Sequence, residues 1–191
     1  MEKSKSNARM LAEGGICIAL SFALSFLKIP IGMSFGGFGG SIDLVMIPLL
    51  IFAIKWGEKW GCLAGLVFGT LKYFMASGLA ISWVSIIFDY SIAYAAVGLA
   101  GIVNRFSNPP SKLAIGIGTF IGCLGRFIIH YISGVTVYAQ YMPEEFMNLK
   151  MTTPTVYSLL YNGTYMLPNT IIAIIVMVLL AFPLRKLYES K

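Results

Sequence analysis

The stretch RFIIHYISGVTVYAQY (Arg126–Tyr141) and, after a short polar loop, YSLLYNGTYMLPN (Tyr157–Asn169) decide how this chain is interpreted. They contain the only histidine, His130, and two asparagines, Asn162 and Asn169, within otherwise apolar sequence. They also contain six of the ten tyrosines, namely Tyr131, Tyr138, Tyr141, Tyr157, Tyr161 and Tyr165. Polar side chains are costly in hydrocarbon, so several that converge usually mark a site.

The composition indicates an integral membrane protein. Of the 191 residues, 58% are hydrophobic and 12% are charged, and the mean hydropathy is +0.81. Soluble domains carry about 25% charged residues. Strand-like alternation of apolar and polar residues is absent, which argues against an outer-membrane barrel. We therefore expect an all-α membrane protein that forms a single domain over residues 1–191.

The charges and the cysteines exclude several other classes of protein. The net charge is +6, but the basic residues cluster at the ends of apolar segments, where they orient helices, so nucleic acid is not an expected partner. Cys17, Cys62 and Cys123 lie far apart in apolar runs, with the spacing of neither a disulfide framework nor a metal motif. No nucleophile–base set or nucleotide-binding loop is evident. We expect neither an enzyme nor a bound metal or cofactor.

Apolar runs bounded by charges, Gly and Pro predict six transmembrane helices. Their approximate ranges are 10–27, 42–54, 60–75, 81–103, 112–138 and 155–184. Met1–Arg9 is polar and basic, but no A-x-A-like site follows, so we expect the first run to stay as a helix rather than to be cleaved as a signal peptide. The glycine-rich segment Ile31–Ser41 is either a flexible connector or a mobile lid over a site. A kink is expected at Pro168.

The basic residues predict the orientation of this bundle. Six helices place both termini on one side, and that side carries ten basic residues: Lys3, Lys5, Arg9, Lys55, Lys59, Arg105, Lys112, Arg185, Lys186 and Lys191. The other side carries Lys28 and Lys150, and Lys72 is a third basic residue there if it is counted with that side. The positive-inside rule then places both termini in the cytoplasm of a multi-pass cell-membrane protein, N-in and C-in. The glycine-rich segment and the Tyr141–Pro154 loop face outside.

Asp89 is an isolated carboxylate within the predicted fourth helix. Such a group is expensive in a membrane unless it is paired or faces water. It either forms a structural pair with Arg126 or acts as the counter-ion of a cationic ligand. His130 lies one turn after Arg126 on the same helix face. Asp43, at the predicted start of the second helix, is read as an acid favoured by the helix macrodipole.

The predicted sixth helix carries one polar stripe, formed by Ser158, Asn162, Tyr165 and Asn169 at helical spacing. The stripe is either hydrogen-bonding glue between helices or the wall of a binding cavity. Its neighbouring tyrosines favour the cavity, because aromatic faces attract cations and stack on flat rings.

Four segments resemble the thiamine-specific substrate-binding components (S-components) of energy-coupling factor (ECF) transporters. Gly39–Pro48, GGSIDLVMIP, resembles the first loop of that family and its entry to the second helix. Phe88–Gly101, FDYSIAYAAVGLAG, resembles its fourth helix. His130–Gly134, HYISG, and Tyr157–Gly163, YSLLYNG, resemble its fifth-helix and sixth-helix signatures. The resemblance covers essentially the whole chain.

The resemblance implies a ligand site near the extracellular side, between helices four, five and six. The residues that it places at ligand-binding positions are Asp89, Tyr90, His130, Tyr138, Tyr157 and Asn162. Tyr138 stands where some members have a stacking tryptophan, and Phe35 and Phe38 stand in the first loop, where some members carry an aromatic residue. Gly15 and Ala19 match a small-residue motif that docks onto the transmembrane coupling (T) subunit. The implied function is thiamine capture for ATP-driven vitamin uptake, with two separate ATPase subunits as further partners.

Two other interpretations remain open from the sequence. The chain could be an S-component for another vitamin, such as riboflavin, in which case Asp89 would have no charged ligand to engage. It could instead be a stand-alone, proton-coupled thiamine transporter that uses Asp89 and His130 as a relay. Gly15 and Ala19 could equally serve close helix packing inside the bundle.

Overall fold

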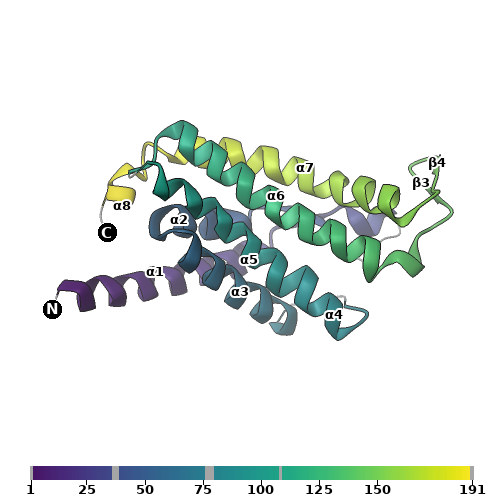
Figure 1. Cartoon of the computed structure of the whole chain (residues 1–191), viewed down its shortest axis with the longest axis horizontal. Helices are drawn as coiled ribbons and strands as arrows, with labels where there is room; N and C mark the ends of the chain where they lie inside the picture. Colours follow the sequence, from purple (N-terminus) through teal and green to yellow (C-terminus); the bar gives the residue numbers. More distant parts are fainter. Residues whose placement is uncertain (1, 36–38, 76–79, 108, 190–191) are drawn as a thin grey trace.

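Two long antiparallel helices form the spine of the molecule (Figure 1). The computed structural model describes residues 2–35, 39–75, 80–107 and 109–189. Helix α6 (Lys112–Thr136) begins where the Ser111 hydroxyl accepts a hydrogen bond from the Ala114 amide, and α7 (Pro154–Leu180) begins at Thr153, whose hydroxyl caps Val156. These are ordinary N-caps, which satisfy amides that lack intrahelical partners.

A third span, from Trp83 to Arg105, packs along α6 and changes its helical geometry three times. Its segments are α4 (Trp83–Ser85), the π-helical η2 (Ile86–Ile92), α5 (Ala93–Val97) and the 3-10 helix η3 (Gly98–Arg105). Asp89 lies within η2. Short π-helical turns often occur at functional sites, because they displace side chains from the regular helical register.

Helix α3 (Glu58–Met75) approaches this span through glycines at successive turns, Gly61, Gly65 and Gly69. A Cβ atom on Gly65 would lie 2.1 Å from the backbone oxygen of Tyr94. Small residues let the backbones of membrane helices approach closely, so this stripe brings α3 against the segment that carries Asp89.

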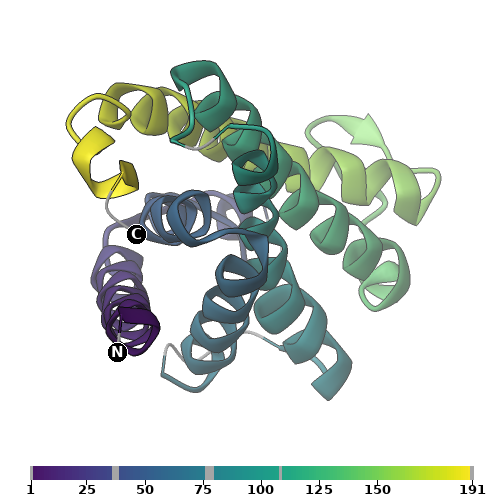
Figure 2. The same cartoon turned by 60° about the vertical axis from the view of Figure 1, so that its left-hand side comes forward.

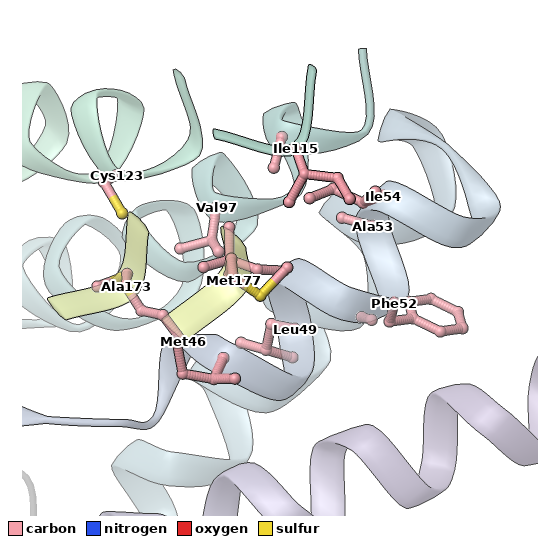
Figure 3. Close-up of a cluster of buried hydrophobic side chains, with 14 of the residues drawn as sticks. Met46, Leu49, Phe52, Ala53, Ile54, Val97, Ile115, Cys123, Ala173 and Met177 are labelled. Carbon is pink, nitrogen blue, oxygen red and sulfur yellow. The ribbon is translucent and has the colours of Figure 1, made fainter. Parts of the chain in front are cut away.

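Helix α2 (Met46–Trp56) forms the centre of the apolar core, and nine of its eleven residues are buried. Figure 3 shows its side chains packed with residues from α5, α6 and α7, among them Val97, Ile115 and Met177. Helix α1 (Glu2–Ser25) packs against α2 and α3 at the periphery (Figure 2). The short α8 (Arg185–Glu189) closes the core with the buried Tyr188.

The short β3–β4 ribbon stands at the opposite end of the bundle from α8 (Figure 1). It pairs β3 (Glu145–Phe146) with β4 (Leu149–Lys150), and a second ribbon pairs β1 (Lys28–Pro30) with β2 (Ser41–Asp43), both antiparallel. The 3-10 turns beside the ribbons are η1 (Gly32–Phe35) and η4 (Ala139–Tyr141). Asn169 ties β2 to α7, because it accepts from the Asp43 amide at 2.9 Å and donates to the Ser41 carbonyl at 2.7 Å.

Four helices of the described residues are long and apolar enough to cross a membrane. They are Ser6–Ser25, Trp83–Arg105, Lys112–Thr136 and Pro154–Leu180. They coincide with the predicted first, fourth, fifth and sixth helices. Helix α2 has eleven residues, and at 1.5 Å per residue it reaches only about half of a hydrocarbon core roughly 30 Å thick.

Several predicted boundaries are wrong. Ile42 and Asp43, expected to open the second helix, belong to strand β2, and the Asp43 side chain accepts from the Val45 amide just before α2 begins. The first helix begins at Glu2 rather than near residue 10. The sixth, expected to reach residue 184, ends at Leu180, and a separate helix, α8, follows that the sequence did not predict. Tyr138 lies beyond α6 instead of within it.

The glycine stripe of α3 generates a stability prediction. Gly65→Ala places a methyl group against backbone atoms that have no rotamer to change, so we expect the free energy of unfolding in detergent to fall by about 1–3 kcal/mol. Gly163→Ala is the matched control, since a Cβ there meets nothing within 4 Å. Thermal unfolding of the two variants measures this, and equal midpoints would contradict the close packing of α3.

Candidate functional site

A cavity of about 280 Å³ opens at the ribbon end of the bundle. Its walls come from the second half of α6, the first half of α7, segment η2 and the β1–β2 ribbon. This volume is just below the size range of small-molecule pockets, which starts at about 300 Å³. All six residues assigned to ligand binding from the sequence line it, namely Asp89, Tyr90, His130, Tyr138, Tyr157 and Asn162. That they bind a ligand stays a prediction.

An acidic pole is built around Asp89. Its Oδ1 lies 3.2 Å from Nδ1 of His130, and its Oδ2 accepts from the Ser133 hydroxyl at 3.0 Å. An ionised carboxylate only accepts hydrogen bonds, so this contact places the proton of the His130 ring on Nδ1. The carboxylate is held by two residues of α6 and keeps 16% of its side-chain surface exposed to the cavity.

A basic pole lies apart from it, around Tyr94. The guanidinium of Arg126 stacks over the Tyr94 ring at 4.3 Å and donates from Nη2 to the Tyr94 hydroxyl at 3.2 Å. Lys72 also donates to that hydroxyl. No ion pair joins Asp89 to Arg126 in the part of the chain that the structure describes, so of the two alternatives for Asp89 the structural pair with Arg126 is wrong. Buried Nε and Nη1 of Arg126 have no described partner.

The polar stripe of α7 forms a hydrogen-bonded network. Asn162 donates from Nδ2 to the Ser158 carbonyl at 2.9 Å, and its Oδ1 accepts from the Tyr165 hydroxyl. The Ser158 hydroxyl donates to the Tyr131 carbonyl of α6 at 2.9 Å. Gly134 makes this approach possible, because a Cβ there would lie 2.2 Å from the Ser158 hydroxyl oxygen. The stripe therefore joins α6 to α7, as the first interpretation expected, and Ser158, Asn162 and Tyr165 also line the cavity. That this cavity binds a ligand stays a prediction.

Tyrosines of α7 form the aromatic wall and hold the β1–β2 ribbon over the cavity. The Tyr161 hydroxyl donates to the Gly39 carbonyl at 2.6 Å and accepts from the Gly39 amide at 3.1 Å. The rings of Tyr157 and Tyr161 lie 5.6 Å apart. Beyond α6, burial raises the pKa of Tyr138 well above its ordinary value, so this phenol stays neutral. Together these rings make a surface on which a flat cationic ring can stack.

Sequence reasoning missed part of the lining. Lys28, Lys72, Tyr94 and Gly39 all line the cavity, and no local pattern marks the two lysines as part of a site. Phe38, which the resemblance placed in the first loop, lies outside the described residues, and so does the side chain of Phe35. Within the described ranges, no group of three or more His, Cys, Asp or Glu side chains is placed to hold a metal ion.

Two small residues of α1, Gly15 and Ala19, are not used for packing inside this chain. Gly15 and Ala19 are exposed, and a Cβ on Gly15 meets nothing within 4 Å. Gly14, which the sequence analysis did not single out, packs against the Phe52 ring instead. The exposed face is continued by Leu11, at 66% exposure, and by neighbouring apolar side chains.

The apolar spans and the cavity lined by polar and aromatic side chains define a multi-pass membrane protein with a pocket at one end. The chain belongs to the Thia_YuaJ family of thiamine transporter proteins, which it matches over residues 11–189. This is a family of transport proteins, so the chain is not an enzyme.

Relatives and solved structures agree with this membership. The thiamine transporter ThiT of Bacillus subtilis is 34% identical over 80% of each chain, and that of Lacticaseibacillus paracasei is 27% identical over 95% of this chain and 91% of its own. ThiT from Listeria monocytogenes has a similar fold, with a TM-score of 0.79 and 24% identity over 96% of this chain and 98% of its own. The S component of a bacterial ECF transporter matches with a TM-score of 0.64 and 17% identity over 96% and 99%.

The α7 network generates a second prediction. Tyr165→Phe leaves the buried Asn162 Oδ1 without its donor, so the ligand-free protein should lose about 1–3 kcal/mol of unfolding free energy. Tyr157→Phe is the matched control, because no described residue bonds its half-buried hydroxyl. Chemical denaturation of both variants tests this, and a Tyr165→Phe variant as stable as the control would refute the network.

Proposed function

We propose that this chain is the substrate-capture S-component of an ECF importer, and that it binds thiamine in the cavity for ATP-driven uptake. The observation that carries the proposal is the acidic pole at Asp89, open to an aromatic cavity, in a member of a thiamine transporter family. Thiamine combines a cationic thiazolium with a flat aminopyrimidine. A carboxylate about 4–6 Å from this permanently charged ring would attract it electrostatically.

The remaining lining fits the neutral half of the ligand. Arg126 brings two buried nitrogen donors without described partners, which suit the ring nitrogen acceptors of an aminopyrimidine. Tyr138 and Tyr157 offer ring faces at the mouth, and Asn162 holds the wall in place. Asp89, Tyr90, His130, Tyr138, Tyr157 and Asn162 are the residues that we assign to the ligand.

The proposed topology has six helical segments in one domain, with both termini in the cytoplasm and the cavity outside. Helix α2 is the shortest of these six segments, and the β1–β2 ribbon directly precedes it in the chain. Both ends of the chain lie at the same end of the bundle in Figure 1, away from the ribbons. Lys55, Arg105, Lys112 and Arg185 lie at helix ends there, as the positive-inside rule requires of a cytoplasmic face.

The proposed partners are a transmembrane coupling subunit and two ATPases. The exposed Gly15 and Ala19 of α1 supply the docking face, since small residues allow close helix approach. No covalent cofactor is invoked, because the energy enters through those separate subunits.

Removal of the carboxylate tests the ligand assignment. Asp89→Asn keeps the shape but loses the charge that faces the thiazolium, so we expect thiamine affinity to fall about 10- to 100-fold. Isothermal titration calorimetry is the measurement. Tryptophan fluorescence is less suitable, because Trp83 is 72% exposed and lines no part of the cavity. Glu145→Gln, which removes an exposed carboxylate in β3, is the charge-matched control.

The alternatives predict different outcomes. If riboflavin or another uncharged vitamin were the ligand, it would bind the wild-type protein and Asp89→Asn alike, and thiamine would not bind. A self-sufficient proton-coupled carrier would move thiamine into vesicles that contain this chain alone under a pH gradient.

The docking face gives a further prediction. Gly15→Leu fills the open surface of α1, so co-purification with the coupling subunit should fall about tenfold or more, while calorimetric thiamine binding stays unchanged. Gly163→Leu is the control, because that glycine is equally free of neighbours. Undiminished association of the Gly15→Leu variant would contradict the assigned face.

A further inference from the structure

A second cavity, of about 260 Å³, lies at the opposite end of the bundle from the first. It is a groove between the start of α6 and the segment that joins α7 to α8. Its apolar walls are Pro109, Pro110, Ala181, Phe182 and the ring of Tyr188. Its polar lining consists of Ser111, Lys112 and Arg185, so we call it the Lys112–Arg185 groove.

The groove lies where two membrane spans end. Helix α6 begins at Lys112, and α7 ends at Leu180, one residue before the groove lining starts. Phe182 is 77% exposed in the chain and Leu113 is 74% exposed. Apolar side chains at this depth face lipid, and lysine and arginine at span ends extend their charged groups to the headgroups.

The charged side chains that line the groove are both basic. No acidic residue lines it, and Lys112 has no ion-pair partner within the described ranges. Arg185 uses its Nε for Glu189 at 2.9 Å, and its side chain is 70% exposed, which leaves the far edge of the guanidinium open to water. An apolar slot flanked by two cations at a membrane boundary is complementary to a molecule with an acyl chain and an anionic head.

We propose that the Lys112–Arg185 groove binds one phospholipid with an anionic headgroup from the surrounding leaflet. The acyl chain lies against Pro110, Ala181 and Phe182, and the headgroup phosphate lies between Lys112 and Arg185. Juxtamembrane basic side chains attract anionic lipids in this way. A small free anion would leave the apolar walls of the groove in contact with water, so we infer a lipid as the ligand.

Retention of lipid by the purified full chain tests the proposal. The protein is incubated in detergent with equal amounts of phosphatidylglycerol and phosphatidylcholine, and bound lipid is counted by native mass spectrometry. We expect phosphatidylglycerol to be preferred about tenfold or more, since each basic side chain is worth a factor of roughly five at an anionic surface. The K112Q/R185Q double variant should reduce the preference to near unity.

Lys186→Gln is the matched control, because Lys186 neighbours Arg185 in α8 but does not line the groove. It should keep the preference. Equal retention of the two lipids by the wild-type protein would overturn the proposal, and this arm does not depend on the folding of any variant. Full displacement of phosphatidylglycerol by soluble glycerol phosphate would also overturn the proposal, because it would show a small-anion site. A lipid preference that survives in a monodisperse double variant would overturn it as well.

Discussion

A carboxylate inside a membrane-spanning bundle constrains everything around it. Such a group is costly there unless it is paired, and His130 and Ser133 of α6 contact the two carboxylate oxygens of Asp89. The π-helical turn of η2 carries Asp89 at this point, while the glycines of α3 let that helix lie against the same span. The local geometry of three helices is thus consistent with the needs of one charged group.

The separation of opposite charges is the second feature of the cavity. Had Arg126 paired directly with Asp89, each would have neutralised the other and neither would be free for a ligand. Tyr94 prevents this, because it holds Arg126 by its ring and hydroxyl and accepts from Lys72 as well. A carboxylate and unpartnered donors are therefore left in one aromatic chamber, an arrangement suited to a ligand with a cationic end and a hydrogen-bonding end.

The sequence predicted the long elements well and the short ones poorly. Hydropathy locates the spans of α6 and α7 to within a few residues, because their length is fixed by the bilayer. The β1–β2 ribbon and α8 escaped prediction, since three-residue strands and a single helical turn carry no periodicity. Helix α2 was predicted as a crossing although its eleven residues are mostly enclosed by protein, and apolar content alone does not separate these cases.

The residues of the site also differ in how well the sequence predicted them. His130 and the α7 stripe could be found because polar residues stand out in apolar helices, and the family resemblance placed Asp89 and Tyr138 beside them. Lys72 reaches the cavity only through tertiary packing, so no local signal marks it. Arg126 was identified, but its partner was not, because sequence spacing could not distinguish Asp89 from the Tyr94 ring as the group that it faces.

The central claim is that Asp89 is the counter-ion of thiamine in this cavity, and a crystal structure of the thiamine-bound protein tests it most directly. The account predicts thiamine enclosed by α6, α7, η2 and the β1–β2 ribbon, with the thiazolium about 4–6 Å from the Asp89 carboxylate. Thiamine bound elsewhere on the molecule, or bound in the cavity with its cationic ring turned away from Asp89, would contradict it.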